Sequence, residues 1–153
     1  MSAETFTATV HWERTGADFV YDTYTRDHRI ELGSGTTLHA SSAPGFLGAT
    51  DRVNPEEQFV SALSSCHMLT FLAVAAKKRF VVDAYDDNAS GVLDKNAGGR
   101  LAMTRVVLRP RVKFSGDKTP TADEITQLHE SAHRGCFIAN SVKADVVCEP
   151  RLT

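Results

Sequence analysis

Residues 54–78, with the sequence NPEEQFVSALSSCHMLTFLAVAAKK, decide the fold of this chain. Asn54 is a preferred N-cap residue, Pro55 suits the first helical position, and two glutamates follow in the first turn, where the helix dipole favours negative charge. Apolar side chains then occupy nearly every face, which is typical of a helix that is enclosed on most sides. We therefore predict a central core helix that runs from Pro55 to about Lys78.

The same helix is the candidate for a membrane span, because residues 58–76 contain no charged side chain. Six of these nineteen residues are polar, namely Gln58, Ser61, Ser64, Ser65, His67 and Thr70. Polar groups at this density would be costly in lipid. We therefore predict a buried helix of a soluble protein that has no membrane partner.

The composition of the whole chain predicts a single domain, residues 1–153. Its 153 residues are 42% hydrophobic, which is enough to fill one core. The formal net charge of -2 argues against nucleic acid as a partner, because proteins that bind nucleic acid present an excess of positive charge. The first residues lack the basic and apolar regions of a signal peptide, so we expect a cytoplasmic protein.

Strand patterns flank the central helix on both sides, with β-branched and aromatic residues alternating with polar ones. The predicted strands cover residues 5–13, 19–24, 28–32, 81–93, 100–116 and 141–150. The fourth and fifth form a turn-linked antiparallel pair, in which Pro110 marks an edge or a bulge. A second helix begins at Thr121, where Glu124 completes a capping box, and ends at Gly135. The order βββ-α-ββ-α-β predicts an α+β fold in which antiparallel sheets wrap around central helices.

The most motif-like string is HESAH at residues 129–133, which matches the HExxH zinc-binding helix of metalloproteases. Its two histidines, His129 and His133, lie one turn apart and could share a metal ion. A zinc protease needs a third ligand, however, and the residues that follow offer only Asp145 and Glu149 as poor candidates. We therefore predict no metal site and interpret the motif as one face of an amphipathic helix. Metal bound after purification would instead indicate a zinc hydrolase.

The three cysteines, Cys66, Cys136 and Cys148, are too few and too widely spaced for a disulfide framework or a CxxC zinc site. Cys66 lies in the middle of the central helix among polar neighbours, although a small buried hydrophobe is the alternative interpretation. Cys136 follows Gly135 at the end of an element, where access is easier. Cys148 shares its strand face with Val and Ala, which indicates an inert side chain. Cys66 and Cys136 are candidates for a redox pair if the fold brings them together.

Four segments carry a more specific pattern. They are NPEEQF at 54–59, ALSSCH at 62–67, TRVVLRPRV at 104–112 and AHRGCFIANSVK at 132–143. In this order they resemble the OsmC/Ohr family, thiol peroxidases that detoxify organic hydroperoxides. The resemblance implies that Cys66 is the peroxidatic cysteine, that Cys136 is the resolving cysteine and that Glu56 orients a catalytic arginine. It also implies an OsmC-like fold and an intertwined homodimer.

The reaction that this resemblance implies needs no cofactor. The Cys66 thiolate attacks an organic hydroperoxide, and Cys136 then condenses with the resulting sulfenic acid to form a disulfide. An external dithiol reduces the disulfide, and in the family a lipoylated protein can play this part. One departure from the family pattern is Phe137, which follows Cys136 where many members have proline.

An attacking Cys66 needs a cationic neighbour, because an ordinary thiol with a pKa of about 8.5 is mostly protonated at neutral pH. The effect of the helix dipole fades within the first turn, and His67 projects about 100° away from Cys66 around the helix. An arginine from elsewhere is therefore required. The family arginine comes from an early strand, where Arg26 and Arg29 both fit and Arg14 is a weaker match.

Glu56 and Cys66 are ten residues apart, which separates them by about 15 Å along one helix and by roughly 80° around it. One arginine is not expected to meet both on the same straight helix. The hypothesis is therefore a composite site, with Glu56 from one subunit and Cys66 from the other subunit of a homodimer. The alternative function is a non-catalytic OsmC-like dimer that binds a hydrophobic ligand or senses oxidation with the same thiols.

Overall fold

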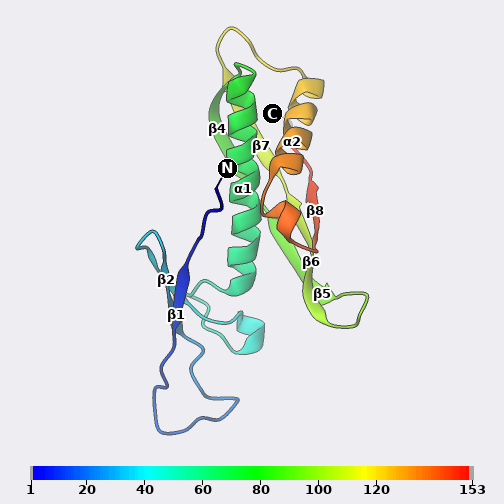
Figure 1. Ribbon diagram of the computed structural model, residues 1–153. Helices are drawn as coiled ribbons and strands as arrows, with labels where there is room; N and C mark the ends of the chain where they lie inside the picture. The colour runs from blue at the N-terminus through cyan, green and yellow to red at the C-terminus, as the bar shows by residue number, and fades with distance from the viewer. Residues whose placement is uncertain (1, 152–153) are drawn as a thin grey trace. The chain divides into compact units, whose positions relative to one another are not determined.

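The computed structural model describes residues 2–151 and has an α+β fold, as predicted. Figure 1 shows its elements in chain order. They are β1 (Ala8–His11), β2 (His28–Leu32), β3 (Thr37–Ala40), η1 (Pro44–Phe46), α1 (Pro55–Lys77), β4 (Val81–Asp87), β5 (Ser90–Lys95), β6 (Leu101–Leu108), β7 (Pro110–Ser115), α2 (Ala122–Gly135), η2 (Ala139–Ser141) and β8 (Asp145–Cys148). The elements η1 and η2 are single turns of 3-10 helix. The chain packs into two compact units, of which the first ends at Gln58 and the second begins at Phe59.

The first compact unit contains an antiparallel sheet in the order β1-β2-β3. The strand predicted at residues 19–24 is wrong, because this segment is a turn in which the amides of Thr23 and Tyr24 donate to the carbonyl of Val20 at 3.1 and 2.9 Å. Its aromatic side chains pack locally instead of joining the sheet, and the ring centroids of Tyr24 and Trp12 lie 6.3 Å apart. The third place in the sheet is taken by β3, which the sequence pattern did not predict.

Helix α1 begins and ends where the sequence predicts. The side chain of Asn54 accepts a hydrogen bond from the amide of Glu57 at 2.9 Å, and the Glu57 carboxylate accepts one from the amide of Asn54 at 3.2 Å. This reciprocal pair satisfies amides that the helix itself leaves without partners. At the other end, Arg79 adopts a left-handed backbone with φ of 64°, and the amide of Phe80 donates to the carbonyl of Ala75 at 3.0 Å. These bonds close the last turn.

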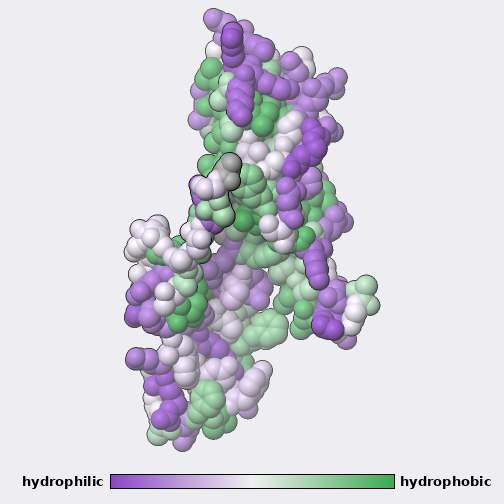
Figure 2. Space-filling view, in the orientation of Figure 1, coloured by the Kyte–Doolittle hydropathy of each residue, from purple (hydrophilic) through white to green (hydrophobic). Residues whose placement is uncertain are grey.

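Only one stripe of α1 is buried in this chain. Its buried residues are Leu63, His67, Phe71 and Ala75, which recur every four positions and therefore share one side of the helix. Leu69 lies on another side and is 60% exposed, and Figure 2 shows hydrophobic surface in the region that α1 occupies. The prediction that the helix is enclosed on most sides is therefore wrong for the single chain, because the elements that follow α1 pack against one stripe. By length and composition alone α1 could also cross a membrane.

The second compact unit contains one sheet of order β4-β7 and another of order β5-β6-β8. Each long strand predicted here is split in two, so that β4 pairs with β7 and β5 pairs with β6. The split falls where Pro110, which has no amide hydrogen for the ladder, begins β7, and where Asp87 accepts the amide of Arg109 at 2.6 Å. One pairing departs from the predicted antiparallel arrangement. Strand β8 returns through α2 and pairs with β6 in parallel.

Helix α2 begins at the predicted capping box. The amide of Glu124 donates to the hydroxyl of Thr121 at 3.2 Å, and the Glu124 carboxylate accepts the amide of Thr121 at 2.9 Å. The helix lies beside α1 (Figure 1) and ends at Gly135, as predicted. A Cβ atom at Gly135 would lie only 3.0 Å from Cγ2 of Thr70, so the missing side chain lets the end of α2 approach α1 closely.

Two apolar clusters form the core of the second compact unit. The first contains Phe71, Ala75, Phe80, Val112, Leu128 and Ala132. The second contains Leu63, Val106 and Leu108. Burial of a large aliphatic or aromatic side chain stabilises a fold by about 1.5–3 kcal/mol. His67 belongs to neither cluster, although it lies on the buried stripe of α1 between Leu63 and Phe71.

Candidate active site

The fold brings the thiols of Cys66 and Cys136 together. Cys66 is half-buried in the middle of α1, and Cys136 is buried at the residue that caps the C-terminal end of α2. Their side chains are hydrogen-bonded to each other, and both cysteines are free. The close approach of the two helices at Gly135, directly before Cys136, places the second thiol against the first. The sequence makes Cys66 and Cys136 candidates for a redox pair only if the fold brings them together, and the structure shows this contact.

The surroundings of Cys136 keep its thiol protonated at neutral pH. Burial raises the pKa of Cys136 to about 11, and the hydrogen bond with Cys66 acts in the same direction. The amide of Ala139, which donates to Sγ of Cys136 at 3.4 Å, opposes this rise in pKa without cancelling it. A protonated thiol is a poor nucleophile. Cys136 is therefore not expected to be the thiol that attacks first.

The chain after Cys136 folds into a turn that leads into η2. The amide of Asn140 donates to the carbonyl of Cys136 at 3.0 Å, and its side-chain amide donates to the carbonyl of Arg134 at 3.1 Å. Phe137, the residue that departs from the family pattern, is 77% exposed. The backbone at Cys136 is thus held by hydrogen bonds, while an apolar ring lies at the surface directly beside it.

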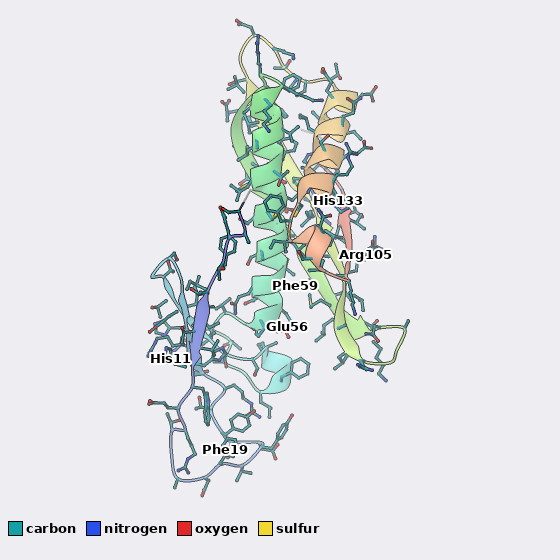
Figure 3. The ribbon with its side chains drawn as sticks, viewed as in Figure 1. His11, Phe19, Glu56, Phe59, Arg105 and His133 are labelled. Atoms are coloured by element: carbon teal, nitrogen blue, oxygen red, sulfur yellow. The ribbon has the colours of Figure 1, made fainter. Side chains whose placement is uncertain are left out.

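Glu56 lies in the first turn of α1 (Figure 3). Its Oε2 atom is buried and has no hydrogen-bond partner among the described residues. Neither Arg26 nor Arg29 forms an ion pair with it within residues 2–151. A buried carboxylate oxygen without a partner costs free energy, which a cationic donor would recover. The predicted pairing of Glu56 with an arginine therefore stays a prediction. Oε2 of Glu56 is the atom that is available to accept a hydrogen bond from such a guanidinium.

Arg26 lies in an aromatic environment of the first compact unit. Its guanidinium carbon is 3.9 Å from the centroid of the Tyr24 ring, and its Nη1 donates to the carbonyl of Tyr24 at 2.6 Å. A cation over an aromatic face is attracted by the ring quadrupole. Arg26 also lines a cavity of about 610 Å³ together with Trp12, Phe19, Tyr21 and the first residue of α1, Pro55. This arginine is therefore held at an apolar cavity that includes the residue next to Glu56 in sequence.

Arg29 has a different environment. It is exposed on β2, and its Nε donates to Oε1 of Glu31 at 3.0 Å. Oε2 of Glu31 lies 3.4 Å from Nε2 of His11, which Figure 3 labels on β1. Arg29 already has a carboxylate partner on its own strand, whereas no carboxylate partner of Arg26 is found among residues 2–151. The two arginines between which the sequence did not choose therefore have different surroundings: Arg29 is paired with Glu31, and Arg26 lines an aromatic cavity.

A second group of polar side chains lies within the core. Nε2 of His67 is 3.1 Å from Nδ1 of His129, and Sγ of Cys148 is 3.7 Å from each of these nitrogens. His67 and His129 are 1% and 3% exposed. Within residues 2–151 these three side chains form the group whose donor atoms lie close enough together to hold a metal ion.

Burial sets the protonation of this group. It lowers the pKa of His67 and of His129 to about 4, with the charges of neighbouring histidines acting in the same direction. It raises the pKa of the Cys148 thiol to about 12. The carboxylate of Asp87 raises the pKa of both Cys148 and His67. At neutral pH the group therefore consists of two neutral imidazoles and a thiol beside one negative charge.

We expect the metal-free protein to lose stability as the pH falls from 6.5 towards 4, because His67 and His129 must stay neutral in the folded state. The unfolded chain binds protons on these imidazoles below pH 6.5, whereas the folded chain binds them only near pH 4. The loss is on the order of 3 kcal/mol for each imidazole. Urea unfolding at several pH values in a chelating buffer measures it. His39→Ala, on an exposed side chain of β3, should keep the same dependence, and a flat free energy of unfolding across this range would contradict the expectation.

The structure corrects two interpretations of the sequence at this group. Cys148 does not face only apolar neighbours, because the buried sides of α1 and α2 bring two imidazoles against β8. The HExxH histidines do not act as a pair, since His129 is buried and His133 is exposed on the next turn (Figure 3). One feature of the sequence does indicate that His67 is buried. It follows Leu63 by four residues and therefore falls on the buried stripe of α1.

Solved structures share this α+β arrangement. An OsmC-like protein of unknown function from Vibrio cholerae is 45% identical, with a TM-score of 0.94 over 97% of this chain and 100% of that chain. An organic hydroperoxide resistance protein from Elizabethkingia anophelis is 19% identical, with a TM-score of 0.72 over 99% and 97% of the two chains. That of Bacillus subtilis is 20% identical, with a TM-score of 0.65 over 97% and 98%. At 19% and 20% identity, the similarity to these two resistance proteins shows a shared fold only. No curated protein sequence matches the chain.

The sequence model of the OsmC-like protein family matches residues 48–151. This range is more than half of the chain and includes Glu56, Cys66 and Cys136. The chain therefore belongs to the OsmC family, which confirms the resemblance found in the sequence. OsmC family proteins are soluble, and in this chain one stripe of α1 packs into the core.

Proposed function

We propose that this protein is a thiol peroxidase that reduces organic hydroperoxides to alcohols, with Cys66 as the peroxidatic and Cys136 as the resolving cysteine. The observation that carries the proposal is the hydrogen-bonded contact of the two thiols, in which burial keeps Cys136 protonated. Membership of the OsmC family supports it, as does the fold shared with two organic hydroperoxide resistance proteins.

The proposed catalytic cycle has three steps. The Cys66 thiolate attacks the hydroperoxide, an S–O bond forms, the O–O bond breaks, and the departing alkoxide takes up a proton to become the alcohol. Cys66 is then a sulfenic acid, oxidised by two electrons. Cys136 attacks its sulfur, the disulfide forms and water leaves. An external dithiol reduces this disulfide by thiol exchange and is itself oxidised, a part that a lipoylated protein could fill.

Arg26 is the arginine that we assign to the first step, because it lines an apolar cavity and has no carboxylate partner in the part of the chain that the structure describes. Its charge would stabilise the Cys66 thiolate and the departing oxygen. Glu56, with its unpartnered buried Oε2, would hold the guanidinium by a two-point ion pair. We infer that the site is assembled in a homodimer, with Glu56 from one subunit and Cys66 from the other, since α1 alone separates them by about 15 Å.

The substrate that this chemistry favours is a hydrophobic peroxide. Three aromatic residues of the Arg26 cavity, Trp12, Phe19 and Tyr24, pack edge to face or tilted, with ring centroids 5.0–6.3 Å apart. Such a surface gains free energy by burying an alkyl or aryl group, and hydrogen peroxide has none to bury. We therefore expect organic hydroperoxides to react faster than hydrogen peroxide.

Turnover tests the proposal. Cumene hydroperoxide and hydrogen peroxide are supplied in excess, each with excess dihydrolipoamide or dithiothreitol, and peroxide consumption is followed. We expect many equivalents of cumene hydroperoxide to be consumed per chain, at a higher rate than hydrogen peroxide. Consumption of a single equivalent would contradict a peroxidase and favour the alternative, a dimer of the same fold whose aromatic cavity binds a hydrophobic ligand and whose thiols sense oxidation.

The variant Cys136→Ser should react once with hydroperoxide and then stop, because no second thiol is available to condense with the oxidised Cys66. Dimedone, which labels sulfenic acids, should then modify Cys66 in this variant and leave the wild-type protein unlabelled under the same conditions. Mass spectrometry of the labelled peptide measures this result. A disulfide that forms at the wild-type rate in the variant would show that Cys136 is not the resolving residue.

The variant Arg26→Ala should slow the reaction of Cys66 with cumene hydroperoxide by about tenfold to a hundredfold, because one charge-assisted contact to a reacting oxygen is lost. Arg29→Ala is the matched control and should react at nearly the wild-type rate, since Arg29 is paired with Glu31. Stopped-flow measurement of the single-turnover rate at neutral pH decides between the two. A loss confined to Arg29→Ala would reverse the assignment, and unchanged rates in both variants would exclude both arginines.

A further inference from the structure

The group of His67, His129 and Cys148 has the dimensions of a metal-binding triad. Its donor atoms are 3.1 Å apart between the two nitrogens and 3.7 Å between the sulfur and each nitrogen. In a tetrahedral Zn²⁺ site, Zn–N and Zn–S bonds of normal length place two nitrogens about 3.3 Å apart and a nitrogen and a sulfur about 3.6 Å apart. Each observed separation lies within a few tenths of an ångström of these values.

The two rings face each other through the nitrogens that would bind the ion. Their centroids are 5.4 Å apart and their planes differ by 11°. Two imidazoles bound to one tetrahedral ion have centroids about 5 Å apart. Nε2 of His67 and Nδ1 of His129 point at each other, as in an N–H···N hydrogen bond, and an in-plane turn of about 35° of each ring would direct both lone pairs at one tetrahedral position.

The triad is held in place by the whole fold of the second compact unit. Its residues come from three elements, since His67 lies on α1, His129 on α2 and Cys148 on β8. Both histidines are almost fully buried, and the ring of Phe71 packs against His129 with the centroids 4.4 Å apart. Ligands that are locked by packing lose little conformational entropy when they bind an ion. The imidazoles are neutral at neutral pH, which leaves their lone pairs available.

The charge near the triad fits a divalent cation. A doubly charged ion bound by one thiolate and two neutral imidazoles carries a net charge of about +1, which is costly inside a protein unless it is balanced. The Asp87 carboxylate is the nearby charge that acts on both Cys148 and His67. It is held by the hydroxyl of Ser64 at 2.5 Å and the amide of Arg109 at 2.6 Å. One thiolate and one carboxylate together neutralise the ion.

A bound ion would also fix which ring nitrogen of His129 carries the proton. Within residues 2–151, its Nε2 and the hydroxyl of Tyr85 are both buried without hydrogen-bond partners, and the two rings have centroids 6.5 Å apart. Without an ion, Nδ1 can either carry the proton or accept one from His67. Ligation through Nδ1 fixes the proton on Nε2, and a ligating histidine donates that N–H to a group outside the metal shell. The Tyr85 hydroxyl is an acceptor of the right kind.

We propose that His67 Nε2, His129 Nδ1 and Cys148 Sγ bind one divalent transition-metal ion of the Zn²⁺ class. The ion displaces one proton from the Cys148 thiol to solvent, and no electrons are transferred. A cavity of about 380 Å³, lined by His129 and Cys148 and also by Glu130 and His133, lies beside the triad. This cavity gives the ion an entry path. The site is separate from the Cys66 and Cys136 pair and does not depend on the peroxidase reaction.

Cobalt titration tests the proposal, because a thiolate bound to tetrahedral Co²⁺ gives a charge-transfer band and strong d–d bands. The background is the full-length variant Cys66→Ser/Cys136→Ser, which removes the other thiols that could bind cobalt. Co²⁺ is added both to folded protein and during refolding from denaturant, so that slow entry does not hide binding. We expect one equivalent per chain and tetrahedral d–d bands. His39→Ala in this background, which removes an exposed histidine of β3, is the control and should bind one equivalent as well.

Adding Cys148→Ala to the same background should remove the charge-transfer band and weaken binding by on the order of a hundredfold or more. Circular dichroism checks that this variant is folded. Zn²⁺ should raise the unfolding temperature of the background protein and should leave that of the folded Cys148→Ala variant unchanged. No binding after refolding with Co²⁺, or a charge-transfer band that persists without Cys148, would overturn the proposal.

Discussion

Cys66→Ser is expected to lower peroxidase turnover with cumene hydroperoxide by at least on the order of 10³-fold, because loss of a catalytic nucleophile removes the covalent pathway. A serine hydroxyl is not ionised at neutral pH and is a very poor nucleophile towards an O–O bond. Steady-state consumption of the peroxide under excess dihydrolipoamide measures the effect. The substitution replaces one sulfur by oxygen on a half-buried position of α1, so the fold should survive, which circular dichroism verifies.

Ser65→Ala is the matched control for this variant. Ser65 is exposed on α1 directly beside Cys66, and its loss should leave turnover within about twofold of the wild type, as for most exposed substitutions. Substantial turnover by folded Cys66→Ser would contradict the proposed mechanism. An equal loss in both variants would show that the effect comes from the helix and not from the thiol.

Mixing two impaired proteins is expected to raise activity above the sum of the two parents. Glu56→Ala removes the carboxylate and Cys66→Ser removes the thiol, yet a heterodimer of the two contains one composite site in which Glu56 and Cys66 are both intact on different chains. With random exchange of subunits, half of the dimers are heterodimers and half of their sites are intact, so turnover should reach about a quarter of the wild-type value. Activity assays before and after exchange measure this recovery.

Exchange itself must be shown independently, for instance by mass spectrometry of the intact heterodimer. If heterodimers form and turnover stays at the sum of the two parent proteins, the site is not shared between subunits. A fully active monomer by sedimentation would contradict the shared site in a different way. Either result would mean that Glu56 acts without meeting Cys66 of another chain.

Local chemistry made parts of this fold predictable. The N-cap of α1 at Asn54, the capping box of α2 at Thr121 and the end of α2 at Gly135 depend on residues within one turn of each other, and the structure has all three. The family was predictable for the same reason, because its motifs are contiguous. The contact of Cys66 and Cys136 followed from the family pattern and was not visible in the spacing of the thiols.

Long-range pairing limited what the sequence could predict. The sequence predicts strands at 81–93 and 100–116 but not the break within each of them. At this break Asp87 accepts the amide of Arg109, and the β4–β7 pairing gives way to the β5–β6 pairing. Residues 19–24 alternate like a strand, yet their aromatic rings pack on Trp12 instead. In both places a tertiary contact overrode the local pattern.

The triad of His67, His129 and Cys148 shows the same limit at a candidate site. Each residue had a plausible local interpretation, and sequence separations of 62 and 81 residues from His67 hide their contact. Periodicity alone placed His67 on the buried stripe of α1. Only the packing of α2 and β8 against that stripe shows that the three side chains meet.

The most direct test of the central claim is disulfide mapping after a single equivalent of peroxide. Fully reduced wild-type protein is mixed with one equivalent of cumene hydroperoxide per chain, quenched with a thiol-alkylating reagent and digested. The account predicts that the Cys66–Cys136 disulfide is the main product, that one alcohol is released per disulfide, and that dihydrolipoamide restores both thiols. A Cys66 that is alkylated as fast as in the untreated protein, or a disulfide that joins Cys66 to any other cysteine, would contradict it.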